Sequence, residues 1–286
     1  MSEFIHTVEA TDLEHAALRD SQHITHLESG GVLYLPQLSF KLDTPDLFNP
    51  AICDAKKKNI SYDYQTQKLG GISAYNPHQS QLQIMMQAYA SYARSLIDTM
   101  LPEYEASVRW GRTSYRPIEI IGRQRSKRQD DTRVHVDAFP STPVQGWRIL
   151  RVFCNVNPDN KPRVWHLGDS FTNVLHQFAP QLSPYQAFKA KLLHRFQITK
   201  TLRTAYDHYM LQLHDHMKLN DTYQSALQKT QMDFAAKSTW VVFTDQVSHA
   251  ALNGQYLLEQ TFYLPISAMA TPKLSPFKQM EQHGLF

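Results

Sequence analysis

The sequence is short of cysteine and of net charge. Its 286 residues include only two cysteines, Cys53 and Cys154, which lie far apart and form no CxxC motif. Such scarcity argues against a disulfide framework and favours a reducing compartment. The formal net charge is only +3 with histidine counted as neutral, so the composition does not indicate a nucleic-acid-binding protein.

Long apolar runs, internal repeats and low-complexity tracts are also missing. No run approaches the roughly 18 apolar residues that a membrane-spanning helix needs. The N-terminus, "MSEFIHTVEATDLEHAALRD", is acidic and polar and does not resemble a signal peptide. We therefore expect a cytoplasmic protein, and peripheral membrane contact stays open. A hydrophobic content of 42% is enough for a sizeable core.

Hydrophobic periodicity predicts one long helix among many strands. Apolar residues between Gln79 and Met100 recur at spacings of three and four, which indicates an amphipathic helix that Pro102 ends. Segments rich in β-branched and aromatic residues are expected to be strands. These segments are residues 30–40, 107–116, 118–122, 133–139, 147–157, 238–245 and 256–265.

A block from about residue 169 to residue 234 breaks this β-rich pattern. It is expected to be helical, with Ser183 as an N-cap and Pro184 at the first helical position. Asn253-Gly254 is a turn signal between the last two predicted strands. We predict a single domain over residues 1–286, mainly antiparallel β-sheet, with a helical N-terminal region and this helical insertion.

The stretch "DTRVHVDAFP" carries the strongest chemical signal. In a strand, residues two apart point to the same face, so His135 and Asp137 can bind one ion together. His249, in the polar segment after the strand "TWVVF", is the candidate third ligand. Two histidines and one carboxylate leave three positions open, an arrangement that suits non-haem Fe(II) working with O₂ and a bidentate co-substrate. A jelly-roll barrel can supply such a trio.

Simpler interpretations compete with this one. Many HxD pairs are solvated or only hydrogen-bonded to each other. A second histidine group, His208, His214 and His216, falls in a segment with helical periodicity. Residues two apart on a helix are about 200° apart, so His214 and His216 cannot share an ion. We interpret this second group as a solvated helix face.

Longer stretches carry a family resemblance. "TRVHVDAFPSTPVQGWRILRVFCNVNPDNKPRVW", the following "GDSF", "VSHAALNGQYLLEQTFYLP" and the upstream "RTSYRPIEIIGR" resemble the bacterial 3-deoxy-D-manno-oct-2-ulosonic acid (Kdo) 3-hydroxylases. The resemblance extends from about Arg112 to Pro265. It implies a double-stranded β-helix (jelly-roll, cupin-like) core, with His135, Asp137 and His249 as iron ligands.

The same resemblance implies the reaction. The members of the Kdo 3-hydroxylase family are Fe(II)- and 2-oxoglutarate-dependent dioxygenases that use O₂ and release succinate and CO₂. The expected substrate is the Kdo sugar of a lipid A precursor, hydroxylated at C3 to give the sugar Ko. Such a lipid is made at the cytoplasmic face of the inner membrane, which fits the expected location of the chain.

The grip on 2-oxoglutarate departs from the broader oxygenase pattern. Many such enzymes use an arginine or lysine ten to fourteen residues after the distal histidine, but here that window reads "EQTFY", with Gln260 inside it. Arg148 and Arg151, on the strand after the HxD motif, are the alternative cations. They fall on opposite faces, and Asn155 shares the face of Arg151. We favour Arg151, although either arginine could be a surface ion pair.

Further cations are candidates for substrate binding. A carboxylated sugar on a phosphorylated lipid would be attracted by a cationic rim. Most basic runs such as "RQRSKR" are merely solvated loops. The candidate cations are Arg116, Arg123, Arg125, Lys127, Arg128 and Arg163.

The sequence is also compatible with three other functions. The chain could be a 2-oxoglutarate oxygenase for another substrate, such as a protein side chain or a small acid. It could be a non-catalytic, cupin-like sugar- or lipid-binding protein with a structural His/Asp pair. A nucleic-acid binder using "RQRSKR" is disfavoured by the near-neutral charge.

Overall fold

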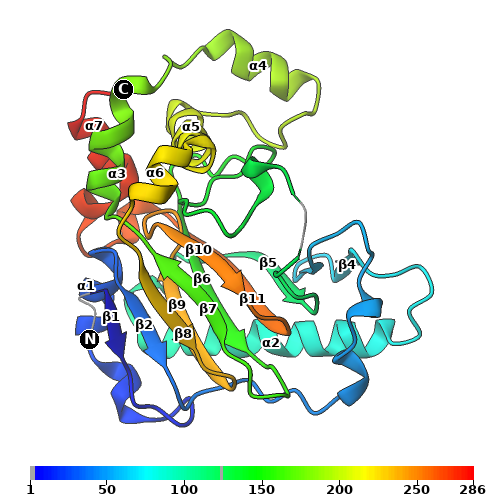
Figure 1. Ribbon diagram of the computed structural model, residues 1–286. Coiled ribbons are helices and arrows are strands. Elements are labelled where there is room, and N and C mark those ends of the chain that lie inside the picture. The colour runs from blue at the N-terminus through cyan, green and yellow to red at the C-terminus, as the bar shows by residue number, and fades with distance from the viewer. Residues whose placement is uncertain (1–3, 123–124) are drawn as a thin grey trace.

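Two β-sheets form the core of the computed structural model, which describes residues 4–122 and 125–286. The large sheet has the strand order β1-β2-β9-β6-β11-β5-β3-β4, and the small sheet has the order β10-β7-β8 (Figure 1). Neighbouring strands are antiparallel, except that β1 and β2 are parallel. The strands are β1 (Ile5–Thr7), β2 (Val32–Leu35), β3 (Ile60–Asp63), β4 (Lys68–Gly70), β5 (Arg109–Arg116), β6 (Arg148–Asn155), β7 (Arg163–Leu167), β8 (Thr230–Phe234), β9 (Ser238–Phe243), β10 (His249–Asn253) and β11 (Leu257–Leu264).

Strand β6 lies inside the large sheet, and every residue in it is buried. Alternate side chains therefore enter two different apolar clusters. Leu150 and Val152 join the cluster under the large sheet. Phe153 points the other way, towards Trp165 and Trp240 in the cluster between the sheets. Because of this alternation, Arg148 and Arg151 of β6 point to opposite faces of the sheet.

The long helix α2 (Gln79–Met100) is confirmed within its predicted bounds. It crosses the face of the large sheet in Figure 1, and its apolar stripe, including Leu82, Met86 and Tyr89, is buried there. The Tyr89 hydroxyl donates to the Val152 carbonyl at 2.9 Å, which satisfies a buried polar group. Past Met100 the chain forms a short 3₁₀ turn that starts at Pro102.

The remaining helices gather mainly at one end of the sheets. The expected insertion contains four helices and ends in β8. Ser183 and Pro184 do not begin a helix, since α4 starts only at Ala187, with Gln186 as its N-cap. The Ser183 amide donates to Gln212, and the Tyr185 hydroxyl donates to the Arg203 carbonyl. The helices are α1 (Gln22–Glu28), α3 (Phe171–Phe178), α4 (Ala187–Arg195), α5 (Ala205–Leu219), α6 (Asp221–Ala226) and α7 (Pro276–Gln282).

Two predicted strands are wrong as strands. Residues 118–122 form turns, and residues 133–139 are extended but pair with a neighbour only at His135. The polar segment around His249 is a loop only in part: residues 244–248 form a turn, and His249–Asn253 are strand β10. Within the described ranges, none of the helices has the length and apolar character that crossing a bilayer requires.

Candidate metal centre and its cavity

Two histidines and one aspartate meet beside the small sheet. His135 and Asp137 come from the extended segment after residue 131, and His249 opens β10. One ligand atom from each residue lies within 4.8 Å of the others, so the three residues together could hold a metal ion. In the described part of the chain, no other histidine, cysteine or carboxylate group reaches this geometry.

Backbone pairing creates this geometry. The His135 amide donates to the His249 carbonyl at 2.9 Å, and the His249 amide donates to the His135 carbonyl at 2.8 Å. The Asp137 amide donates to the Thr244 carbonyl at 2.8 Å, which continues the extended course. His135 and Asp137 therefore share one face, and the two imidazole rings lie 4.9 Å apart between centroids.

Each imidazole is fixed in one tautomer. Nδ1 of His135 donates to the Arg133 carbonyl, and Nδ1 of His249 donates to the Val247 carbonyl, both at 2.8 Å. Since a carbonyl can only accept, the lone pair of each ring must be on Nε2. Burial lowers the pKa of both histidines, so both rings are neutral near pH 7. Metal-ligating histidines are typically oriented in this way.

Asp137 supplies the negative charge of the group. Its Oδ1 lies 3.7 Å from Nε2 of His135, and its Oδ2 lies 3.1 Å from Nη1 of Arg151. Burial alone would raise the pKa of this carboxyl group, but Arg151 and the two histidines hold that pKa below its ordinary value. Two neutral nitrogens and one carboxylate oxygen are a donor set that fits Fe(II) with open coordination positions.

A cavity of about 210 Å³ opens beside these three residues. Its walls carry both charges: Arg151 Nη1 lies 3.3 Å from Glu259 Oε1, and Arg116 Nη2 lies 2.7 Å from Glu259 Oε2. Burial would raise the pKa of Glu259, but the two guanidinium groups hold it below its ordinary value. Other lining residues include Lys58, Asp131, Phe139, Phe153, Arg163 and Trp165.

Of the four predicted co-substrate contacts, only Arg151 lines this cavity. Arg148 points to the opposite face of β6, where it is fully buried and donates to Asp245 at 2.7 Å and to Gln246 at 2.6 Å. Gln260 also points away, because it is one residue from Glu259 on β11, and it accepts from Thr113. Asn155 donates to main-chain carbonyls at the end of β6. The structure therefore does not bring these three residues to the site.

The predicted substrate cations divide into two sets. Arg116 and Arg163 line the cavity, and Arg163 Nη1 donates to the Gly254 carbonyl at 2.7 Å. Arg125, Lys127 and Arg128 are exposed and outside the cavity lining. Lys127 pairs with Asp221, and Arg128 pairs with Asp215. Arg123 lies outside the described residues.

Several residues at the site escaped the sequence analysis. His214 is part-buried on α5, with its ring 5.3 Å from that of His135, so our interpretation of it as a solvated residue is wrong. Lys218, one turn later, is buried 3.8 Å from Asp131. Glu259 lies ten residues after His249, in the window where the broader oxygenase pattern places an arginine or a lysine. None of these residues carries a local motif. Only the four-residue spacing of His214 and Lys218 predicts that they share a face of a helix.

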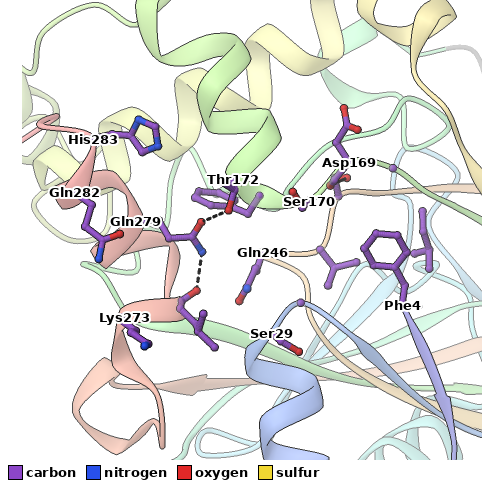
Figure 2. A pocket seen from close by; sticks show the side chains of 17 residues that line it. Phe4, Ser29, Asp169, Ser170, Thr172, Gln246, Lys273, Gln279, Gln282 and His283 are labelled. Atoms are coloured by element: carbon purple, nitrogen blue, oxygen red, sulfur yellow. Dashed lines mark hydrogen bonds between the residues drawn. The ribbon is translucent and has the colours of Figure 1, made fainter. Parts of the chain in front are cut away.

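A second, slightly larger cavity of about 290 Å³ is lined in part by Gln246, Val247 and Ser248, the loop that precedes His249 (Figure 2). Amide and hydroxyl groups dominate its polar lining. The Thr172 hydroxyl donates to Gln279, and Gln279 in turn donates to the Leu274 carbonyl, so this lining ties α3 to the C-terminal segment. It brings together no set of metal ligands among the described residues. The His/Asp/His cavity is therefore the better site for chemistry.

Comparisons with known proteins support this choice. A family model described as 3-deoxy-D-manno-oct-2-ulosonic acid (Kdo) hydroxylase matches residues 10–284. A crystal structure of the Kdo hydroxylase KdoO, a non-haem Fe(II) α-ketoglutarate-dependent dioxygenase, in complex with cobalt(II), is 45% identical with a TM-score of 0.93. The alignment covers 98% of this chain and 95% of that one.

A second KdoO structure, in complex with α-ketoglutarate and Fe(III), is 44% identical with a TM-score of 0.92 over the same shares of the two chains. A third, with succinate and Fe(III), has the same identity, TM-score and coverage. No curated protein matches the chain. The likeness to these solved structures confirms the expected jelly-roll core.

Proposed function

Because the chain belongs to the Kdo hydroxylase family, we propose that it hydroxylates C3 of the Kdo sugar in a lipid A precursor, giving Ko. Membership of this family gives the general activity: the chain is a non-haem Fe(II)- and 2-oxoglutarate-dependent dioxygenase that uses O₂ and acts on a Kdo-containing substrate. The observation that carries the finer proposal is the His135/Asp137/His249 group inside a cavity lined by arginines.

We propose that Nε2 of His135, Nε2 of His249 and the Asp137 carboxylate hold the iron. The fixed tautomers support this assignment, because both nitrogens are ready to bind without losing a proton. The bound iron would supply the oxidative chemistry, in which 2-oxoglutarate is converted to succinate and CO₂ and one oxygen atom enters the sugar. The protein fixes the open ligand geometry and orients both substrates.

Arg151 is the proposed anchor for 2-oxoglutarate. Its guanidinium lies beside Asp137 and is buried at the cavity wall, so a carboxylate bound there would meet a desolvated, planar cation. Arg116 and Arg163 line the same cavity. The co-substrate has two carboxylates and Kdo has one, so more than one cation is needed to balance them. We assign Arg116 and Arg163 to these anions as well.

Beyond the cavity, we propose that the exposed cations Arg125, Lys127 and Arg128 attract the phosphorylated lipid over a longer range. Lys127 pairs with the exposed Asp221, and Arg128 pairs with the part-exposed Asp215, so these two pairs are weak and can be exchanged for a substrate phosphate. A substrate of this kind brings the protein to the surface of the inner membrane as a peripheral protein.

The first test is spectroscopic. Fe(II) and 2-oxoglutarate are added to the purified apo-protein without oxygen, and the visible spectrum is recorded. We expect a weak charge-transfer band that needs both additions and is missing in His135→Ala. Absence of the band, with iron not retained, would favour the sugar- or lipid-binding alternative, in which the His/Asp pair is structural.

The second test concerns the substrate. Turnover of 2-oxoglutarate to succinate is measured with Kdo-lipid A, with lipid A that lacks Kdo, and with a panel of peptides and small acids. We expect coupled succinate release and a hydroxylated sugar only with the Kdo-containing lipid. Coupled turnover on a peptide or a small acid instead would replace the proposed substrate and keep the chemistry.

A further inference from the structure

One helix with its following loop exposes an unusual number of apolar side chains. Half of the ten large hydrophobic residues that are exposed in the described chain fall within residues 187–203, here called the α4 segment. Phe188 is 76% exposed and Phe196 is 66% exposed. Isolated exposed apolar residues need no explanation, but such a concentration marks an interaction surface. The five residues are Phe188, Leu192, Phe196, Ile198 and Leu202.

The charge of this region has one sign. No acidic residue occurs in the sequence from Ser170 to Tyr206. The α4 segment itself carries five lysines and arginines, and none of them has a carboxylate within 4.0 Å among the described residues. Cations interleaved with aromatic and aliphatic side chains are typical of segments that lie in the interface of an anionic membrane. The five cations are Lys189, Lys191, Arg195, Lys200 and Arg203.

The segment packs on very little of the protein. Ala190 in α4 and Thr199 after it are the only buried residues of the segment, all of which the structure describes. Figure 1 shows α4 at the outer edge of the molecule, beyond α5 and at the end opposite the turn between β8 and β9. A helix with its apolar residues in water gains little from folding against its own protein. A surface that covers those residues is therefore needed to explain them.

The end of this segment is tied directly to the wall of the active site. The Lys200 amide donates to the Ser141 carbonyl at 2.9 Å, and the Arg203 guanidinium donates to the Pro140 carbonyl at 2.7 Å. Both acceptors belong to the loop that follows Asp137, and Phe139 of that loop lines the cavity. Whatever the α4 segment binds is thus held next to the cavity.

We propose that the α4 segment is the membrane-docking element of the enzyme, and that its occupant is an anionic lipid surface. The proposal rests on the proposed lipid substrate, and it adds which surface meets the bilayer and how it is joined to the site. The five apolar side chains enter the interfacial layer, and the five cations contact lipid phosphates. A substrate embedded in the same bilayer then reaches the cavity without leaving the membrane.

The test measures binding of the full-length protein to vesicles by flotation. The vesicles are phosphatidylcholine alone or phosphatidylcholine with about one third phosphatidylglycerol. We expect binding to the anionic vesicles that weakens as salt is raised. Binding should weaken at least about tenfold in Lys191→Glu/Arg195→Glu, because each cation near the surface contributes a factor of about five. It should weaken by a similar factor in Phe188→Ser/Phe196→Ser/Ile198→Ser, because three apolar side chains no longer enter the interfacial layer.

Matched controls come from other surfaces of the molecule. Ile84, on α2, is 68% exposed, and Lys41 and Lys237 are exposed lysines outside the α4 segment. Ile84→Ser and Lys41→Glu/Lys237→Glu should bind vesicles within about twofold of the wild type. Wild-type protein that ignores anionic vesicles, or α4-segment variants that bind as the wild type does, would overturn the proposal.

Two further measurements distinguish membrane docking from dimer formation and from failure of the proposed substrate. Light scattering checks whether the segment instead joins two copies of the chain; a dimer that the triple serine variant abolishes would overturn membrane docking. Turnover on a water-soluble Kdo oligosaccharide tests the substrate. We expect the α4-segment variants to match the wild type there and to lose turnover only on Kdo-lipid in vesicles. Vesicle binding with no Kdo turnover in any protein would reject the proposed substrate and leave docking intact.

Discussion

His135 and His249 are hydrogen-bonded to each other through their backbones, each amide donating to the carbonyl of the other at 2.9 and 2.8 Å. This reciprocal pair is an isolated antiparallel bridge between two segments far apart in the sequence. The positions of the two imidazoles therefore depend on main-chain pairing and on the carbonyls that hold each Nδ1. Changes to the side chains of the site should leave that framework in place, which makes the following experiments interpretable.

Replacing Asp137 by alanine should remove metal binding and turnover while the chain stays folded. The hydrogen bond that the amide of residue 137 donates to the Thr244 carbonyl does not need the side chain. Loss of groups that only support metal ligands typically costs 10- to 100-fold in affinity, so loss of a charged ligand should cost more than about 100-fold. Calorimetric titration with Co(II) measures the affinity. Asp159→Ala, whose carboxylate lies 3.8 Å from the exposed Lys161 and outside the lining of the cavity, is the control. Unchanged metal affinity would exclude Asp137 as a ligand.

Replacing Arg151 by glutamine should raise the KM for 2-oxoglutarate. A hydrogen bond to a charged group contributes about 1.5–3 kcal/mol, which corresponds to a rise of about 10- to 100-fold. Steady-state kinetics with varied 2-oxoglutarate give this value separately from kcat. Arg112→Gln offers a matched control, since Arg112 is half-exposed and pairs only loosely with Asp63 at 3.6 Å. If both variants showed the wild-type KM, the anchor would have to be another cation of the cavity.

Replacing Arg148 by methionine should destabilise the protein without changing the KM for 2-oxoglutarate. Its guanidinium is buried against Asp245, and removing one partner of a buried ion pair costs about 3–5 kcal/mol because the other charge is left unpaired. Urea denaturation measures the free energy of unfolding. Arg148→Met/Asp245→Leu, which removes both charges, should recover much of the loss. A single variant as stable as the wild type would contradict this account.

The apo-protein should lose stability as the pH falls below about 6.5, the ordinary pKa of histidine. Burial lowers the pKa of His135 and His249 in the folded state, so between that pH and their lowered pKa values only the unfolded chain takes up their protons. Protonation then favours unfolding. Thermal melts of metal-free protein from neutral to mildly acidic pH should show the decline.

The control for this pH effect is His135→Gln/His249→Gln, which cannot take up these protons. Its Tm should fall less over the same interval. Equal declines in both proteins would mean that other groups cause the acid sensitivity. Added metal should reduce the fall in Tm only at pH values where the protein still binds the metal, because protons and metal compete for the same nitrogens.

Local sequence pattern was sufficient for part of the fold and of the site. The apolar spacing from Gln79 to Met100 gave α2 with its bounds, because a helix is specified by residues three and four apart. The spacing of His135 and Asp137 gave their shared face, since alternation in an extended chain is equally local. The segments 147–157 and 238–245 gave β6 and β9 through their content of β-branched and aromatic residues, which is also a local property.

Alternation also separated Arg148 from Arg151, but it could not say which face held the cavity. That choice depends on Asp245, Glu259 and Asp137, which reach β6 from distant parts of the chain. Strand status was non-local as well. Residues 133–139 have the composition of a strand, yet only His135 forms a β-bridge, whereas the polar stretch at His249 becomes β10 by pairing with β7.

The sequence by itself thus determined which side chains could bind a metal and which periodicity each segment follows, because both depend on near neighbours. The tertiary structure alone decided that His214 lies against His135, that Glu259 balances Arg116 and Arg151, and that a basic, apolar helix stays uncovered at the edge. Each of these relationships joins segments whose meeting is set by sheet register and helix packing, and no local pattern encodes them.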